Sequence, residues 1–199
     1  MADTTPVPAN TDPEILRQAQ TGDEAAFGVL MRTHYEQVFR LVHAIMRNEH
    51  DSRDVCQEVW LTIWKHLPKF RGDAKFTTWI HPIAVRRAID HLRKRRRWYD
   101  RFLPFSVEAD TNADAVESAP EPSTTDDARQ QTESAERITR LRRVLDSLPP
   151  KLRAVLALRE VEGLSYEEIA KVTAIPTGTV MSRLYHARRL LAQKLKDQP

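Results

Sequence analysis

Hydrophobic residues recur at intervals of three and four along most of the chain, which is the period of an amphipathic α-helix. The longest such segment spans residues 24–47, and its inward positions are Phe27, Leu30, Met31, His34, Val38, Leu41, Val42 and Ile45. A shorter helix is predicted over residues 13–20, and Gly22 with Asp23 forms the corner between the two. Few segments alternate with the two-residue period of a strand, so the pattern predicts an all-α protein.

A third helix is predicted over residues 52–66 from the apolar positions Val55, Val59 and Ile63. Asp51 and Asp54 supply capping chemistry near its start, and Pro68 follows its end. A fourth helix is expected over residues 78–98. Pro82 lies near its first turn, where a proline removes about one backbone hydrogen bond, so a mild bend is predicted instead of a stop.

The periodicity is lost over residues 104–134, which contain three prolines, many acids and few large apolar residues. Such a segment cannot build a core and is predicted to be a linker. The helical pattern returns over residues 138–148 and, after a Pro-Pro pair, over residues 152–158.

Two small helical domains joined by a flexible acidic linker are therefore predicted. Residues 1–12 are expected to form a disordered tail, residues 13–102 the first domain, residues 103–134 the linker and residues 135–196 the second domain, which ends in a helix-turn-helix.

Composition and charge refine this picture. With 41% hydrophobic and 30% charged residues, the 199-residue chain has the composition of a soluble globular protein. The net charge of +3 conceals a strongly basic run over residues 86–101 and an acidic run over residues 103–133. This segregation indicates a polyanionic partner for the basic run.

No segment approaches the roughly 18 consecutive apolar residues of a membrane span, and the first residues do not form a basic or apolar leader. A cytoplasmic protein without membrane insertion is expected. Cys56 is the only cysteine, so an internal disulfide and a multi-cysteine zinc site are excluded. It is interpreted as a buried structural thiol, with a redox switch as the alternative.

The segment LSYEEIAKVTAIPTGTVMSRLYHARRLL, residues 164–191, predicts a helix-turn-helix. Ser165 and Glu168 form a capping box for a helix over residues 166–173, and Thr177 or Gly178 opens the second helix. Val180, Leu184 and Leu191 are expected to face the core. The outward residues would enter a major groove of DNA: Thr179, Met181, Ser182, Tyr185, His186 and Arg189. From spacing alone, a hairpin that packs only on itself is the alternative.

The sequence LDSLPPKLRAVLALREVEGLSYEEIAKVTAIPTGTVMSRLYHARRLL resembles the domain of the sigma-70 family that reads the promoter minus-35 element, in the extracytoplasmic-function (ECF) class. DVCQEVWLTIWKHLPKFRGDAKFTTWIHPIAVRRAIDHLRKRRR resembles the same family's minus-10-reading and core-binding domain. The resemblance covers nearly the whole chain except the tail and the linker. It implies a promoter-specificity subunit of RNA polymerase that is not an enzyme, needs no cofactor or metal, is monomeric when free and is controlled by an anti-sigma factor.

The resemblance also implies roles for residues of the first domain. Residues Asp54, Gln57 and Glu58 match positions that contact core polymerase, although without the family an ordinary solvated face is the simpler interpretation. Residues implied in minus-10 binding are Lys69, Phe70, Arg71, Lys75, Phe76, Arg86, Arg87, Arg93 and Lys94. Bases interleaved with aromatic rings suit single-stranded DNA, but Phe70, Phe76 and Trp79 are alternatively core residues. Arg86 occupies a position at which many relatives carry Asn. Two roles are open for its guanidinium group: contact with a base, or binding of phosphate alone.

In the second domain the residues implied in minus-35 binding are Thr177, Thr179, Met181, Ser182, Arg183, Tyr185, His186 and Arg189. Met181 occupies a place that is often basic in relatives and would offer apolar contact to a thymine methyl group. Arg183 alternatively binds phosphate or braces the fold. The acidic linker is interpreted either as a mimic of nucleic acid or as a solubilising spacer.

Two other classes of protein fit the sequence less well. A DNA-binding regulator with a similar helix-turn-helix would carry an N-terminal domain with alternating strands, and residues 13–102 show no such pattern. An enzyme is disfavoured because the chain has no P-loop and no zinc-type His/Glu motif, and its seven histidines do not cluster at ligand spacing.

Overall fold

The computed structural model describes residues 11–102 and 125–197, and all of the secondary structure in these ranges is helical. In chain order the elements are α1 (Pro13–Gln20), α2 (Glu24–Met46), α3 (Glu49–His66), the 3-10 turn η1 (Leu67–Lys69), α4 (Phe76–Phe102), α5 (Thr125–Asp146), α6 (Pro150–Glu160), α7 (Tyr166–Thr173) and α8 (Thr177–Asp197). The all-helical prediction is confirmed. The predicted tail up to residue 10 and linker residues 103–124 lie outside the described residues.

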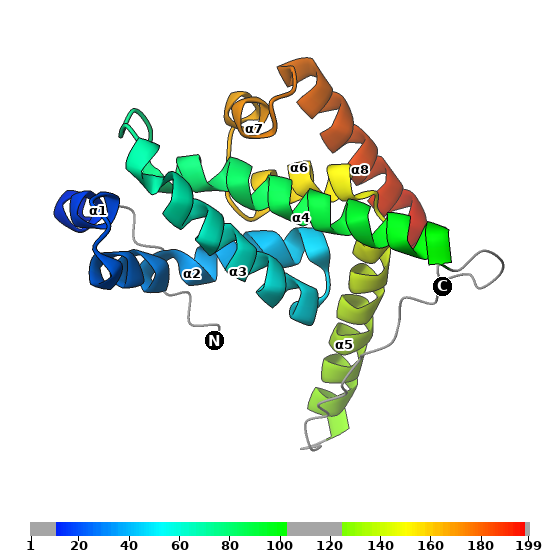
Figure 1. The fold of residues 1–199 in the computed structure, drawn as a ribbon. Coiled ribbons are helices and arrows are strands. Elements are labelled where there is room, and N and C mark those ends of the chain that lie inside the picture. Colours follow the sequence, from blue (N-terminus) through cyan, green and yellow to red (C-terminus); the bar gives the residue numbers. More distant parts are fainter. Residues whose placement is uncertain (1–10, 103–124, 198–199) are drawn as a thin grey trace.

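Helices α2, α3 and α4 pack against one another, and α1 packs on α2 (Figure 1). The corner between α1 and α2 follows the prediction: Gly22 has a φ of +95°, and the Asp23 side chain accepts a hydrogen bond from the Ala26 amide at 2.9 Å. The fully buried side chains of this bundle include Leu41, Val42, Ile45, Val55, Val59, Ile63 and Ile80. The helix faces that pack against one another are therefore those that the apolar spacing of the sequence predicted.

Two helix starts differ from the prediction. Helix α3 begins at Glu49, three residues earlier than expected, because the Asn48 side chain caps it by accepting from the Asp51 amide at 2.8 Å. Helix α4 begins at Phe76, and Pro82 lies inside it without ending it. A proline this close to the start removes few hydrogen bonds, so the helix continues to Phe102.

Helix α5 begins at Thr125, within residues 103–134 that were predicted to be linker, so the later part of this range is helical. The reason lies in local propensity. After Pro122 the chain reads TDDARQQTESAER, which has no proline or glycine and is rich in good helix formers. Figure 1 shows α5 projecting away from the rest of the molecule at its start.

Helices α6, α7 and α8 form the second helical region, and α8 packs on α5, α6 and α7. Pro150 is the first residue of α6, where its missing N–H costs nothing. The buried side chains of this region include Val144, Leu148, Val155, Leu158, Ile169, Val180, Leu184 and Ala187. The predicted inward positions Val180 and Leu184 are confirmed, whereas Leu191 is only half-buried.

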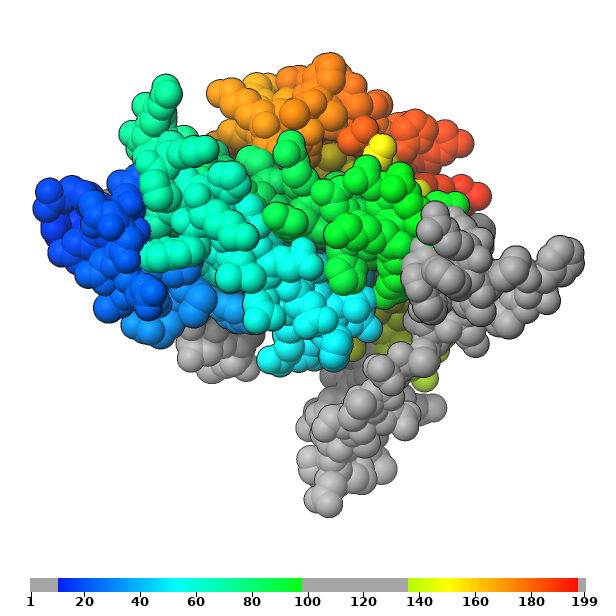
Figure 2. Space-filling view, in the orientation of Figure 1, coloured from blue at the N-terminus to red at the C-terminus, as the bar shows by residue number. Residues whose placement is uncertain are grey.

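The two helical regions pack against each other. Helix α6 contacts α2 and α4, and α7 contacts α4, so buried apolar residues of both regions form one continuous cluster. Figure 2 shows the surface of α7 (orange) resting against α4 (green). Because the chain was expected to hold two domains related only through a linker, this packing is a feature that the hydrophobic pattern did not reveal.

Candidate nucleic-acid and polymerase interface

The loop between η1 and α4 presents three bases around an aromatic cluster. Lys69, Arg71 and Lys75 are all exposed. The rings of Phe70 and Phe76 meet at a centroid distance of 5.9 Å, and Trp79 lies 5.1 Å from Phe70 and 5.9 Å from Phe76. The backbone that carries these bases is therefore anchored on an apolar cluster.

The aromatic rings do not themselves face solvent. Phe76 is 4% exposed and Phe70 is 9% exposed, and Phe76 also packs against the ring of His34 at 5.3 Å. A base can stack only on a ring face that is accessible to it. The burial of Phe70 and Phe76 is what the core alternative predicts for both rings.

Helix α4 carries the basic run along its exposed side. Arg86, Arg93 and Lys94 are exposed, and Arg87 is half-buried. Arg93 donates to Asp90 at 2.9 Å, while Arg87 lies 3.8 Å from Glu58 of α3. These pairs are solvent-exposed and worth about 0–1 kcal/mol each, so the guanidinium groups can exchange them for phosphates at small cost.

Arg95 has a different role within the same basic run. It donates to Asp51 of α3, and His91 lies 3.9 Å from the same carboxylate. This cluster ties the two helices together near the start of α3. Arg95 was part of the predicted DNA-facing run, but its partner in the structure is a carboxylate of the fold.

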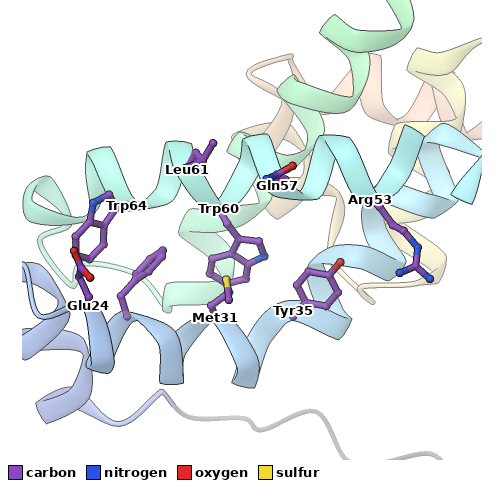
Figure 3. Close-up of a pocket in the computed structure, with 9 residues that line it drawn as sticks. Glu24, Met31, Tyr35, Arg53, Gln57, Trp60, Leu61 and Trp64 are labelled. Atoms are coloured by element: carbon purple, nitrogen blue, oxygen red, sulfur yellow. The ribbon is translucent and has the colours of Figure 1, made fainter. Parts of the chain in front are cut away.

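The exposed face of α3 presents Asp54, Gln57 and Glu58 to solvent, as their spacing predicted. Beside this face a groove of about 590 Å³ lies between α2 and α3 (Figure 3). It is lined by Glu24, Phe27, Met31, Tyr35, Arg53, Gln57, Trp60, Leu61 and Trp64. Polar residues along one side of an apolar channel suit a helix from a protein partner.

Sequence reasoning missed this groove. Trp60 lies in the helix predicted over residues 52–66, which was interpreted only as amphipathic. In the structure the ring centroid of Phe27 lies 6.0 Å from that of Trp60 and 4.7 Å from that of Trp64. Leu61 is 56% exposed although it is large and apolar. Two tryptophans four residues apart, with an exposed leucine beside them, form the signal that could have pointed to the groove.

The helix-turn-helix has the geometry that its capping residues predict. The Ser165 side chain accepts from the Glu168 amide at 3.2 Å, and the Glu168 carboxylate accepts from the Ser165 amide at 2.8 Å. The hydrogen bond from the Ser165 backbone lowers the pKa of Glu168. Ala174 ends α7 with a φ of +52°, and α8 begins at Thr177, which confirms the predicted corner.

The outer face of α8 carries the predicted minus-35 residues. Met181 and Tyr185 are 50% and 63% exposed. Ser182, His186 and Arg189 are also exposed, while Thr177, Thr179 and Arg183 are half-buried. Large apolar and aromatic side chains exposed on one helix face are suited to contact with base edges.

A polar contact joins the two helical regions, and no spacing rule pointed to it. Glu162 follows α6, and its Oε2 atom accepts from Gln37 Nε2 at 2.7 Å and lies 3.0 Å from His81 Nε2. The side chains of His81 and Glu162 are 7% and 3% exposed. Burial alone raises the pKa of Glu162, but the hydrogen bonds from His81 and Gln37 outweigh it and hold the pKa below its ordinary value.

Cys56 is completely buried on α3, and burial raises its pKa to about 12. The thiol therefore stays protonated at neutral pH, as the structural interpretation requires. Within residues 11–102 and 125–197, no group of three or more His, Cys, Asp or Glu side chains could hold a metal ion. The same ranges contain no helix that is long and apolar enough to span a bilayer.

Family models match both helical regions. The model for sigma-70 region 2 matches residues 30–98, and the model for sigma-70 region 4 matches residues 138–191. Together they cover more than half of the chain. The matched segments contain the basic face of α4 and the helix-turn-helix of α7 and α8, which are the two surfaces suited to nucleic acid.

Full-length relatives agree with these matches. The chain is 33% identical to the RNA polymerase sigma-H factor of Pseudomonas aeruginosa over 93% of its length and 94% of that protein. It is 34% identical to the ECF RNA polymerase sigma-E factor of Escherichia coli K12 over 94% of its length and 95% of that protein. The chain belongs to the sigma-70 family of RNA polymerase sigma factors, in the ECF class. Sigma factors are non-enzymatic subunits of RNA polymerase.

Two solved structures share the fold. CnrH in complex with the cytosolic domain of CnrY has a TM-score of 0.61 and 22% identity, over 94% of this chain and 97% of that one. The sigma factor RpoE of Bartonella quintana, in complex with the anti-sigma factor NepR, has a TM-score of 0.64 and 19% identity, over 87% of this chain and 98% of that one.

Proposed function

We propose that this ECF sigma factor binds core RNA polymerase through α3, reads the minus-10 element through the loop before α4, and reads the minus-35 element through α8. The observation that carries the proposal is the outer face of α8, where Met181 and Tyr185 are exposed beside Ser182, His186 and Arg189. This exposed face combines the apolar and hydrogen-bonding groups that base edges require.

Core polymerase is proposed to dock on the polar rim of the groove between α2 and α3. Asp54, Gln57 and Glu58 form the polar part of the surface, and Gln57 also lines the groove. A partner with basic residues beside an apolar anchor would be complementary to both parts. The anchor would fill the channel beside Trp60 and Trp64, and the bases would meet the carboxylates.

The minus-10 strand is proposed to follow the exposed bases Lys69, Arg71 and Lys75 and then the basic face of α4. The contacts from the loop are charge contacts to the strand, since the neighbouring rings are buried. Arg86, Arg87, Arg93 and Lys94 would then hold the phosphates of the duplex next to the melted segment.

Control by an anti-sigma factor is also proposed. The support is the shared fold of Bartonella quintana RpoE, which was solved in complex with an anti-sigma factor. An inhibitor that covers α3, α4 or α8 would block the surfaces described above. We further propose that the free protein is a monomer that acts in the cytoplasm, where polymerase and promoters lie.

The function is tested by run-off transcription from a random-promoter library with purified core polymerase, with and without this protein. We expect transcripts that appear only with the protein and whose promoters share two short elements at a fixed spacing. The recovered sequences would also supply the base preferences of Arg86 and of α8. Absence of such transcripts, together with duplex binding by the protein alone, would favour a regulator that does not use polymerase.

Lys75→Ala is expected to weaken promoter opening without lowering stability. Lys75 is exposed at the start of α4, so its removal costs the fold little but deletes one phosphate contact. The measurement is the fraction of open complex formed by holoenzyme as a function of salt, and the salt slope should fall by about 1. Lys151→Ala, which removes an exposed lysine from α6, is the matched control. Equal opening by Lys75→Ala and the wild type at all salt concentrations would exclude the contact.

A further inference from the structure

The contact between the two helical regions is centred on a carboxylate that is almost completely shielded from water. Glu162 lies in the short connection between α6 and α7, and its side chain is 3% exposed. Its partners come from two other helices: Gln37 from α2 and His81 from α4. One side chain of the second region is therefore bound by two side chains of the first region, Gln37 and His81, which together form what we call the socket.

Another ionic contact across this boundary is more exposed. Arg47, which follows α2, donates to Asp146 at the end of α5 at 2.7 Å, and these side chains are 18% and 41% exposed. Solvent screens such a pair, whereas removing one partner of a buried pair leaves the other without its hydrogen bonds and is costly. Of these two contacts, Glu162 therefore contributes more to holding the regions together.

Unpaired polar atoms lie close to the two groups that bind Glu162. A small cavity of about 10 Å³ adjoins the socket, and His34, Gln37 and His81 are among its lining residues. Each of these three carries a buried ring or amide atom without a hydrogen-bond partner among the described residues: Nδ1 of both histidines and Oε1 of Gln37. When the two regions separate, His81 and Gln37 become accessible to water, which then replaces the hydrogen bonds that they made to the carboxylate, so the contact is reversible.

The packed arrangement cannot engage two separated promoter elements at once. Elements centred near minus-35 and minus-10 are roughly 25 base pairs apart, which is about 85 Å of duplex at 34–36 Å per turn. A compact chain of this length has a radius of gyration of about 16 Å and is only about 40 Å across. Since α4 and α7 are in contact in the closed form, the regions must separate before both elements are bound.

We propose that Glu162 is a latch: its carboxylate, held in the socket of Gln37 and His81, keeps the free chain closed and has to be released for the chain to span a promoter. The second half of this proposal rests on the function proposed above. The first half concerns the free protein alone. The latch sets the fraction of molecules that is competent to bind, so apparent affinity falls with the closed fraction.

The latch is tested on the full chain by single-molecule energy transfer between dyes on Glu36→Cys and Gln193→Cys. Both positions are exposed, on α2 and α8, and the buried thiol of Cys56 will not compete for the dyes. Glu162→Ala should raise the ratio of open to closed molecules by about tenfold or more, because it leaves His81 and Gln37 unpaired. Gln37→Ala should act in the same direction from the other side of the contact.

The double variant Gln37→Ala/Glu162→Ala should open the chain no further than Glu162→Ala alone, since both changes remove the same hydrogen bond. Glu167→Ala, which truncates an exposed carboxylate on α7, is the matched control and should leave the ratio unchanged. If Glu162→Ala unfolds the second region, the ratio of open to closed molecules in Gln37→Ala, compared with the wild type, becomes the test. An unchanged ratio in a folded Gln37→Ala or Glu162→Ala protein would overturn the latch.

The consequence for function is measured separately, as affinity for core polymerase. Latch variants should bind core more tightly, by up to the factor by which the open fraction rises. Opening without any gain in affinity would overturn the claim that closure limits binding. If even the wild type failed to bind core, the proposed function would fail, while the energy-transfer result on the free chain would still stand.

Discussion

Replacing Phe76 with alanine should lower the free energy of unfolding by about 3–5 kcal/mol and leave little folded protein at elevated temperature. The ring is 4% exposed and lies between Phe70, Trp79 and the ring of His34. Truncation would leave a cavity in a cluster that supports both the loop and the start of α4. The measurement is chemical denaturation followed by circular dichroism.

This prediction also separates the two interpretations of the aromatic loop. Phe39→Ala is the matched control, because Phe39 is a half-buried ring on α2 and its loss should cost less. Promoter opening by Phe76→Ala should fall only as far as the loss of folded protein requires. A stable Phe76→Ala protein that binds core polymerase but cannot open promoters would show that the ring touches DNA after all.

Charge reversal at Glu58 is the second change with a large expected effect. Glu58→Lys should weaken affinity for core polymerase by more than tenfold, because it replaces an attractive contact with a repulsive one at a surface proposed to meet a basic partner. The fold should be retained. The pair with Arg87 is long, at 3.8 Å, and largely exposed, so its loss costs about 1 kcal/mol or less.

The measurement for Glu58→Lys is equilibrium binding of labelled protein to core polymerase at several salt concentrations. Glu36→Lys makes the same change of charge at an exposed position on α2 and should retain affinity. The difference between the two variants should shrink as salt rises, since exposed charges are screened. Equal affinity of Glu58→Lys and the wild type would exclude α3 as the docking surface.

The parts of the fold that could be predicted are those fixed by local chemistry. The corner at Gly22 and Asp23, the capping box of Ser165 and Glu168 and the start of α8 each depend on residues close together in sequence, and each is found as predicted. The start of α3 was predicted too late because Asp51 and Asp54 were taken as its capping residues. In the structure Asn48 serves as the cap, and Asp51 pairs with Arg95.

The parts of the site that could not be predicted depend on contacts between distant residues. Exposure of Met181 and Tyr185 follows from helical spacing, because the opposite face of α8 is apolar. Burial of Phe70 does not follow from helical spacing, because it results from packing against residues on other elements. The contact between Gln37 and Glu162 joins residues 125 positions apart, and nothing in either neighbourhood indicates the other.

Different helices of the second region carry its two surfaces, which bears on how proteins of this family change their promoter specificity. Contacts with the first region are made by α6, the adjoining Glu162, α7 and Asp146 at the end of α5, whereas the proposed base-reading face belongs to α8. On the proposed function, substitutions on the outer face of α8 would alter promoter choice while the surface that packs on α2 is left intact. Duplicated genes would then acquire new regulons through a few positions on one helix, without changes to the contacts between the two helical regions.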